Sequence, residues 1–294
     1  MNQTQTQTDP DSPGYTFDNY VASGYAPDLY RCSAVADGIG SFADLTDEGV
    51  RRFHEQGYMV VHHAFSEAEV RTALEGLIDL IDGRNPDFKG LEFEVSVRDR
   101  LPTMTREEKV DAVRKLVRFV GYDPRLDALS THPKLLGTLA RLMGTPAALF
   151  SNQAMLKPPR IGREKPWHQD HAYFNLPMGT CIISAWVALD EAAPENGCMH
   201  VIPGSHRDGP VVHFKRRDWQ ICDTHVDTDR ILAVPLKPGG CLLWHGLLHH
   251  GSPATLSPKR RRALQLHYVP ERTGQITAEE RLAVFGSEGK DVTC

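Results

Sequence analysis

A short histidine and carboxylate motif, together with one distant histidine, could bind a metal ion. His168 and Asp170 lie two residues apart in the segment Trp-His-Gln-Asp, and His250 follows 80 residues after Asp170. Alternate side chains of a strand share one face, so a strand over this motif would point His168 and Asp170 the same way, roughly 7 Å apart along the backbone. Two imidazoles and one carboxylate form a facial triad that leaves three cis positions of an octahedral iron(II) ion open. The three residues therefore predict a site for iron, a small co-substrate and oxygen.

A closed structural zinc site is the simplest alternative, and the cysteines argue against it. Structural zinc is enclosed by protein ligands, which commonly include thiolates. The six cysteines include no pair with CxxC spacing. A His-X-Asp pair is weak support for a metal when it stands alone, because histidine often serves only as a buried hydrogen-bonding group. The combination with a distant histidine and a downstream arginine is what favours the open metal site.

The distal ligand is ambiguous, because His245, His249 and His250 crowd one segment. Neighbouring residues of a strand face opposite ways, so His249 and His250 cannot both face the metal. His250 is favoured, with His249 as the alternative and His245 as a packing or outer group. We assign His171 to the pocket wall or to a local hydrogen bond, and the remaining candidates, His200, His206 and His267, to structure.

Arg261 could hold a carboxylate, because a guanidinium offers two parallel charge-assisted hydrogen bonds. The alternative is that the run Lys-Arg-Arg-Arg at 259–262 is only a basic turn. Strand alternation separates the two interpretations, since it places Arg261 with Ala263 and Gln265 on one face and Arg260 with Arg262 on the other. Arg261 facing inward would bind the distal carboxylate of a keto acid whose other end chelates iron.

Several motifs resemble those of the phytanoyl-CoA dioxygenase family of iron(II)- and 2-oxoglutarate-dependent oxygenases, over about residues 45–270. The motifs are Lys157-Pro158-Pro159, Trp167-His168-Gln169-Asp170, Trp186-Val187-Ala188-Leu189, the block from Glu195 to His206, and His250-Gly251-Ser252 through Arg261.

The resemblance implies a mainly β fold with flanking helices, a double-stranded β-helix or jelly roll of the cupin type. It also implies Fe(II) and 2-oxoglutarate as cofactors, and it supports His250 because Gly251 and Ser252 follow it as in the family. By the same resemblance Trp186 packs on the co-substrate, with core packing as the alternative, and Gln153 lies beside it. Lys157 shares a strand face with Gln153, and a basic residue on a preceding helix, Arg114 or Lys115, is expected to reach the site.

Together the residues and the resemblance predict a dioxygenase that hydroxylates a small or medium organic substrate and releases succinate and CO2. Desaturation, cyclisation or epoxidation are other outcomes of the same chemistry. Two other classes stay open: a cupin-type metal-binding module, and an isomerase or hydrolase that uses another divalent ion. Neither needs a buried carboxylate clamp, so Arg261 distinguishes them from an oxygenase.

Composition and charge favour small molecules and O2 as partners over nucleic acid or a membrane surface. A net charge of −5 over 294 residues gives no electrostatic reason to expect nucleic acid or an anionic membrane surface. No apolar run approaches the roughly 20 residues of a membrane helix, and the first residues do not resemble a signal peptide. We expect a cytoplasmic protein, whose oligomeric state the sequence does not indicate.

By composition and predicted secondary structure, the chain divides into a tail, a helical part and a strand-rich part. Residues 1–15, rich in Gln and Thr, are expected to be a disordered tail. The remainder, 16–294, is expected to form one oxygenase domain, because jelly-roll proteins commonly reach this size as a single unit. Its predicted parts are a mostly helical support at 16–145, a jelly-roll core at 146–272, and a C-terminal helix and tail at 273–294. Capping signals and periodicity predict helices near 47–56, 67–82, 106–119 and 133–143, with a strand at 58–61.

Residues 207–230 show weak periodicity and many charges. Long loops of this kind are often lids or binding segments. A solvated surface excursion is the alternative, and the sequence does not choose between them.

Overall fold

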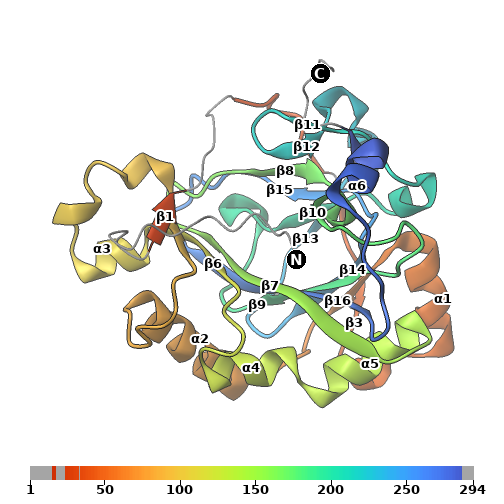
Figure 1. Cartoon of the computed structure of the whole chain (residues 1–294), viewed down its shortest axis with the longest axis horizontal. Coiled ribbons are helices and arrows are strands. Elements are labelled where there is room, and N and C mark those ends of the chain that lie inside the picture. The colour runs from red at the N-terminus through yellow and green to blue at the C-terminus, as the bar shows by residue number, and fades with distance from the viewer. Residues whose placement is uncertain (1–14, 18–23, 33, 287–294) are drawn as a thin grey trace.

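The computed structural model describes residues 15–17, 24–32 and 34–286, in which two β-sheets lie face to face (Figure 1). Helices cover the outer face of the larger sheet. In sheet order, the larger sheet contains β1 (Tyr15–Phe17), β5 (Leu91–Phe93), β6 (Val113–Val117), β7 (Ala147–Lys157), β16 (Arg261–Pro270), β9 (Ile183–Ala188), β14 (Cys241–His245), β4 (Tyr58–Val61) and β3 (Gly38–Ile39). The smaller sheet contains β2 (Ala34–Val35), β13 (Leu232–Val234), β10 (Met199–Val201), β15 (His250–Ser252) and β8 (Lys165–His168). A separate hairpin pairs β11 (His213–Lys215) with β12 (Trp219–Ile221).

The helices begin where polar side chains cap their free amides. Thr46, Ser66, Thr105 and Thr277 each accept a hydrogen bond from the backbone N–H three residues later, which satisfies one donor of the first turn. The helices are α1 (Asp47–Gln56), α2 (Glu67–Ile81), α3 (Arg106–Val110), α4 (Pro124–Ser130), α5 (Pro133–Met143) and α6 (Ala278–Phe285). In the described residues no helix is long and apolar enough to cross a bilayer.

Strand alternation divides each central strand between two hydrophobic layers. On β9, Ile183, Ala185 and Val187 pack with the residues of the helices, while Trp186 and Ala188 pack with the smaller sheet. The same division holds on β14 and β16, whose alternate apolar residues fall into the two layers. The space between the sheets therefore receives every second side chain of three adjacent strands, and this is where the site lies.

The expected helix over 106–119 is wrong in its second half. Its capping box does open α3, but the helix ends at Val110, and Val113–Val117 form β6 between β5 and β7. Val113 and Leu116 are fully buried there. Pairing with two neighbouring strands has overridden the local helical pattern, which is why a single-sequence prediction fails here.

The other expected elements mostly coincide with the structure. Helices α1, α2 and α5 and strand β4 lie where they were predicted, whereas α4 was not predicted. The part called helical support, 16–145, also contributes β4, β5 and β6 to the larger sheet. Of the predicted tail, residues 1–14 lie outside the described residues and Tyr15 belongs to β1; of the C-terminal part, 287–294 also lie outside them.

Residues 207–230 are more ordered than the sequence suggests. They contain the hairpin of β11 and β12 and short 3-10 turns at Asp223–His225 and Thr228–Arg230. The hairpin packs beside β8, the strand that ends at His168. Whether this segment covers a substrate stays a prediction.

Candidate metal and co-substrate site

Two strands of the smaller sheet and one turn bring three predicted residues together. His168 is the last residue of β8 and pairs directly with His250, the first residue of β15. Asp170 lies past the strand, at the start of a 3-10 turn over Asp170–Tyr173. Its Oδ1 is 3.5 Å from Nε2 of His168 and 3.4 Å from Nε2 of His250. We expected strand alternation to bring Asp170 to the histidines, but a turn after the strand does so instead.

The two imidazoles are oriented by backbone carbonyls. Nδ1 of His168 lies 2.8 Å from the Pro166 oxygen, and Nδ1 of His250 lies 2.9 Å from the Leu248 oxygen. Since a carbonyl only accepts, each Nδ1 carries the proton, and each Nε2 keeps its lone pair for a metal. Nε2 of His250 is buried without a hydrogen-bond partner. Burial, with His250 nearby, lowers the pKa of His168 to about 4, so this ring is neutral as a ligand must be.

The carboxylate of Asp170 presents one oxygen to the histidines and binds donors with the other. Oδ2 accepts a hydrogen bond of 2.6 Å from Ser184 Oγ and one of 2.8 Å from Trp244 Nε1. Burial alone would raise the pKa of Asp170, but His250, His267 and the hydrogen bonds hold it well below its ordinary value. Asp170 is thus an ionised carboxylate with Oδ1 facing the two Nε2 atoms.

Sequence reasoning missed the residues that orient Asp170. Ser184 and Trp244 were not singled out, and His267 was assigned to structure. Nδ1 of His267 lies 2.8 Å from Ser184 Oγ, and because Ser184 donates its proton to Asp170, His267 must donate to Ser184. His267 lies on the same alternating face of β16 as Arg261, so the strand argument that singled out Arg261 would also have identified His267.

This donor set fits iron(II). Two imidazole nitrogens and one carboxylate oxygen, all within 4.8 Å of one another, match a two-histidine, one-carboxylate triad with open positions. The orphaned Nε2 of His250 is a buried polar atom that a metal would satisfy. Within the part of the chain that the structure describes, this is the one group of histidine, cysteine or acidic side chains found at such spacing.

Arg261 lies inside the barrel, as alternation predicts. Its guanidinium carbon is 5.1 Å from the centre of the Trp186 ring, and Nη1 donates to the Met155 carbonyl at 3.1 Å. Its Nε is buried without a hydrogen-bond partner. Burial, helped by Arg114, lowers the pKa of Arg261 to about 9, which is an energetic cost that a bound carboxylate would remove. Trp186 thus contacts the predicted clamp, and Nη2 and Nε remain for a ligand.

The other predicted co-substrate residues lie on β7, opposite β16. Lys157 pairs with Arg261, and Gln153 pairs with Gln265, so Gln153 and Lys157 share the inward face as expected. Arg114 and Lys115 lie on strand β6, which corrects their expected place on a helix. Lys115 Nζ is 3.5 Å from Glu92.

The remaining histidines lie away from the three ligand atoms. His249 is outside the metal group; its backbone N–H donates to Ser205 Oγ at 2.9 Å. Nε2 of His171 is 3.1 Å from the Leu176 oxygen, and Nε2 of His206 is 3.0 Å from the His54 oxygen. Nδ1 of His245 accepts a hydrogen bond from the backbone of Leu247, and Nδ1 of His200 is 3.2 Å from the Cys198 oxygen.

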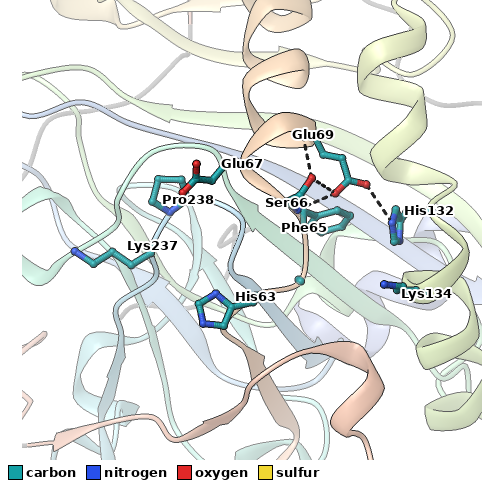
Figure 2. Close-up of a pocket in the computed structure, with 10 residues that line it drawn as sticks. His63, Phe65, Ser66, Glu67, Glu69, His132, Lys134, Lys237 and Pro238 are labelled. Carbon is teal, nitrogen blue, oxygen red and sulfur yellow. Dashed lines mark hydrogen bonds and ion pairs between the residues drawn. The ribbon is translucent and has the colours of Figure 1, made fainter.

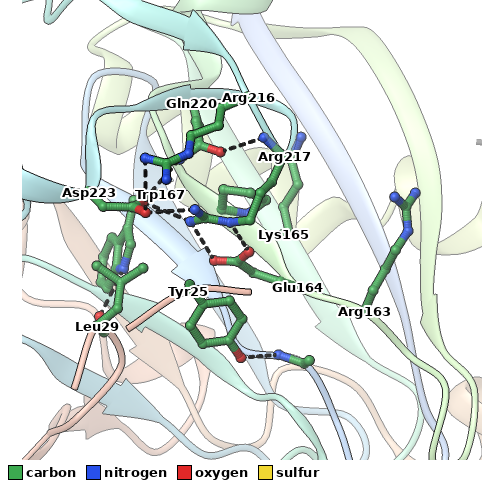
Figure 3. Close-up of polar contacts among 12 residues, drawn as sticks. Tyr25, Leu29, Arg163, Glu164, Lys165, Trp167, Arg216, Arg217, Gln220 and Asp223 are labelled. Atoms are coloured by element: carbon green, nitrogen blue, oxygen red, sulfur yellow. Dashed lines mark hydrogen bonds and ion pairs between the residues drawn. The ribbon is translucent and has the colours of Figure 1, made fainter. Parts of the chain in front are cut away.

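Buried ion pairs fasten the hairpin segment to the strand that carries His168. Arg217 donates to Glu164 at 2.7 Å and to Asp223 at 2.6 Å (Figure 3). Tyr30 also donates to Glu164, at 2.6 Å. Lys165 Nζ is 2.6 Å from Asp218 Oδ2. Removing one partner of a buried pair leaves an uncompensated charge, so these contacts hold residues 217–223 firmly against β8.

An open cavity of about 800 Å³ lies elsewhere on the molecule. Figure 2 shows it between the start of α2 and the start of α5, with Phe65, His132 and Lys134 among the residues that line it. None of the residues that line it is one of the three candidate metal ligands. It is therefore separate from the candidate metal site.

A sequence model of the family "Phytanoyl-CoA dioxygenase (PhyH)" matches residues 53–263, which include all three candidate ligands and Arg261. The chain belongs to this family. Phytanoyl-CoA dioxygenase 1 of Oryza sativa subsp. japonica is 28% identical over 258 residues, which are 76% of this chain and 89% of that protein. Phytanoyl-CoA dioxygenase domain-containing protein 1 of Danio rerio is 25% identical over 281 residues, 80% of this chain and 96% of that protein.

Solved structures of similar fold agree with this membership in the PhyH family. EctD from S. alaskensis, crystallised with 2-oxoglutarate and 5-hydroxyectoine, has a TM-score of 0.63 and 22% identity, covering 92% of this chain and 91% of that one. SnoK, an alpha ketoglutarate dependent carbocyclase from nogalamycin biosynthesis, has a TM-score of 0.64 and 24% identity, covering 86% and 98%. The jelly-roll fold is confirmed. As a PhyH-family member the protein is a non-haem dioxygenase with Fe(II) and 2-oxoglutarate as its cofactors, as the resemblance implied.

Proposed function

We propose that His168, Asp170 and His250 hold the iron and that Arg261 holds the distal carboxylate of 2-oxoglutarate, in an enzyme that hydroxylates a small or medium organic substrate. The observation that carries the metal assignment is the saturation of Asp170 Oδ2 by Ser184 and Trp244, which leaves Oδ1 facing two lone pairs. A purely structural carboxylate would not need two neutral imidazoles aimed at its second oxygen. Asp170 Oδ1 and the two Nε2 atoms are therefore placed to bind a divalent cation.

The chain's own residues supply position, charge and exclusion of water. When bound, iron and 2-oxoglutarate supply the oxidising chemistry, with succinate and CO2 as co-products. The carbonyls of Pro166 and Leu248 fix both histidine rings, and Ser184 and Trp244 fix the carboxylate. Arg261 would fix the far end of the co-substrate through a two-pronged charge pair in a dry part of the barrel.

The substrate is a small molecule whose identity stays open. Relatives carry names as different as phytanoyl-CoA dioxygenase and, in Gimesia maris, methylphosphonate hydroxylase, the latter 27% identical over 236 residues. Family membership therefore does not by itself assign a CoA thioester. The cytoplasmic location and the single-domain organisation expected from the sequence also stay predictions.

A metal-binding module, or an isomerase or hydrolase, is the alternative within the same fold. Neither requires a buried guanidinium with unused donors. Arg261 has a buried, unpartnered Nε and stacks on Trp186 in the barrel interior. This favours a ligand with a second carboxylate, and therefore an oxygenase.

A stabilisation assay, followed by a turnover assay, tests the proposal. Anaerobic protein loaded with iron(II) should gain thermal stability on addition of 2-oxoglutarate, by about 2.7 kcal/mol at 100 times the dissociation constant. Candidate substrates are then screened by succinate release, with product mass separating hydroxylation from desaturation or cyclisation. Stabilisation by divalent ions without any effect of 2-oxoglutarate would support the module or the hydrolase instead.

A further inference from the structure

Three buried basic side chains meet at the end of the barrel that holds Arg261. The carbonyl oxygen of Arg163 accepts a hydrogen bond from Lys157 Nζ at 2.6 Å and another from Arg114 Nη1 at 3.1 Å. Lys157 and Arg261 are direct partners across β7 and β16. Lys157, Arg114 and Arg261 are each no more than 2% exposed. Three groups that can carry positive charge therefore share one dry region.

The two carboxylates near this cluster, Glu94 and Glu164, pair with arginines and not with Lys157. Glu94 is 3.8 Å from Arg114 Nη1 and also 3.0 Å from Arg163 Nε. Glu164 is paired with Arg217. Among the residues that the structure describes, no carboxylate is within salt-bridge distance of Lys157 Nζ, whose acceptor is the neutral carbonyl of Arg163.

Lys157 is also fixed in place. A Cβ on Gly197, a residue with φ of +82°, would lie 2.5 Å from Cδ of Lys157, so the lysine stem occupies space that only glycine leaves open. A Cβ on Gly162 would lie 2.8 Å from the Cα of Lys157. The lysine stem is thus closely packed on the strand beside Arg261, and its buried amine donates to the Arg163 carbonyl.

The surroundings favour the neutral amine in the absence of a ligand. Burial lowers the pKa of Lys157 well below its ordinary value, and Arg261 and Arg114 lower it further, against the opposing effect of Glu94 and Glu164. His200 on β10 is near enough to interact electrostatically with Lys157, and this ring is itself neutral because burial lowers its pKa to about 4. An anion placed here would reverse the balance for Lys157.

We propose that Lys157 is the second cation of the co-substrate site and that its amine takes up one proton when the distal carboxylate of 2-oxoglutarate binds beside Arg261. Opposite residues of adjacent strands lie about 5 Å apart at their Cβ atoms, so a carboxylate on Arg261 is within reach of Lys157. The proton comes from solvent, and the neutral amine becomes an ammonium ion paired with the carboxylate. This inference rests on the proposed function, because it assumes that 2-oxoglutarate binds at Arg261.

The sign of the pH dependence follows from linkage. The bound state holds the proton more tightly than the free state, so affinity for 2-oxoglutarate is greatest below the pKa of the free amine. It falls by up to about tenfold per pH unit as the pH rises from the free to the bound pKa. If Arg261 alone paired with the carboxylate, Lys157 would add no pH dependence to the affinity for 2-oxoglutarate.

Calorimetry measures the proton directly. Iron(II)-loaded protein is titrated anaerobically with 2-oxoglutarate in buffers of different ionisation enthalpy, between pH 7 and pH 9. Below pH 8, where Arg261 with its pKa of about 9 is already protonated, we expect net uptake approaching one proton with 2-oxoglutarate and none with pyruvate, which lacks the distal carboxylate. Lys157→Met should abolish the uptake and weaken 2-oxoglutarate binding by roughly tenfold, as expected for loss of one hydrogen bond between charged groups.

Lys165→Met is the matched control, since Lys165 is another largely buried lysine but already pairs with Asp218. It should keep the proton uptake. Equal uptake by the unaltered protein and Lys157→Met, or no uptake by the unaltered protein at any pH in this range, would overturn the inference even if the variant folded poorly. Absence of any 2-oxoglutarate binding by the unaltered protein would instead overturn the proposed function.

Discussion

The two ends of the barrel interior differ in how their charges are matched. At the candidate metal end, one ionised carboxylate, Asp170, faces two imidazoles, and its second oxygen is already bound by Ser184 and Trp244. At the other end, Arg261 and its basic neighbours lie close together with few free carboxylates. The first end carries a negative charge that suits a dication, and the second carries a positive excess that suits an anion.

Under the proposed function, the two ends of the interior complement the two parts of one bound complex, the metal ion and the distal carboxylate. A keto acid that chelates iron presents its far carboxylate a few bonds away, so metal and anion arrive in a fixed relation. Neither end is satisfied by protein groups alone, since Nε2 of His250 and Nε of Arg261 are both buried and unpartnered. Without cofactors the protein therefore keeps a buried negative charge at one end and a buried positive charge at the other. Binding of the proposed cofactors would neutralise both charges.

Breaking the metal end should have the largest effect. His250→Ala, or alanine at His168 or Asp170, should remove most iron(II) affinity and all but a trace of turnover while the fold persists, because a facial triad has no spare ligand. Iron content after anaerobic loading measures this. His249→Ala is the matched control, because it removes the neighbouring imidazole. Iron loss in His249→Ala with retention in His250→Ala would show that we chose the wrong distal ligand.

Loosening the carboxylate without removing it should have a smaller effect. Ser184→Ala and Trp244→Phe each delete one donor to Asp170 Oδ2, and loss of such an outer partner typically lowers metal affinity by about 10- to 100-fold. Competition with a chelator measures the affinity. Ser205→Ala is the control, since Ser205 is also fully buried but donates to the Ile202 carbonyl. Iron affinity that is unchanged in both variants would contradict the role assigned to these donors.

Breaking the anion end should affect the co-substrate and leave iron binding intact. Arg261→Ala should raise the apparent dissociation constant of 2-oxoglutarate at least about tenfold, since hydrogen bonds to charged groups contribute about 1.5–3 kcal/mol. Lysine at 261 should restore it only in part. The metal-to-ligand absorption band under anaerobic titration measures this. Arg260→Ala, which removes an exposed partner of Asp111, should change little. An unchanged constant in Arg261→Ala would disprove the clamp.

The smallest expected effect is on acid stability. Burial lowers the pKa of His200 to about 4. Because the unfolded chain binds that proton near pH 6.5 and the folded chain does not, stability is full above pH 6.5 and falls as the pH drops towards 4. His200→Gln should reduce the loss between pH 7 and pH 5 by on the order of 1–2 kcal/mol. Urea unfolding of iron-free protein measures it, and an identical pH profile in the variant would refute the assignment.

The sequence predicted the residues of the site better than the way they are positioned. The three candidate ligands and Arg261 could be singled out because their residue types and the motifs around them are visible in the sequence, although His250 lies 80 residues after Asp170. Asp170, however, converges on the histidines through a 3-10 turn rather than through alternation. A difference of one or two residues in where a strand ends depends on tertiary packing, which local patterns do not contain.

Partners that come from distant strands were the hardest to predict. Ser184, Trp244 and His267 meet Asp170 only because β9, β14 and β16 are neighbours in the larger sheet. Strand order is a property of the fold, and no spacing in the sequence reveals it. The same holds for the meeting of Arg114 with Lys157, since Arg114 lies on a strand that was expected to be helical.

Gln169, between the two ligands of the Trp-His-Gln-Asp motif, joins the metal site to two surrounding loops. Its side-chain amide donates to the carbonyls of Gly209 and Leu247 and accepts from the N–H of Val211, each at 2.8 Å. All three partners are backbone groups, so Gln169 depends on the path of these loops and not on their side chains. In engineering terms, an exchange of residues 214–230 would have to keep Arg217 and Asp218, because their pairs with Glu164 and Lys165 hold this segment against the strand that carries His168.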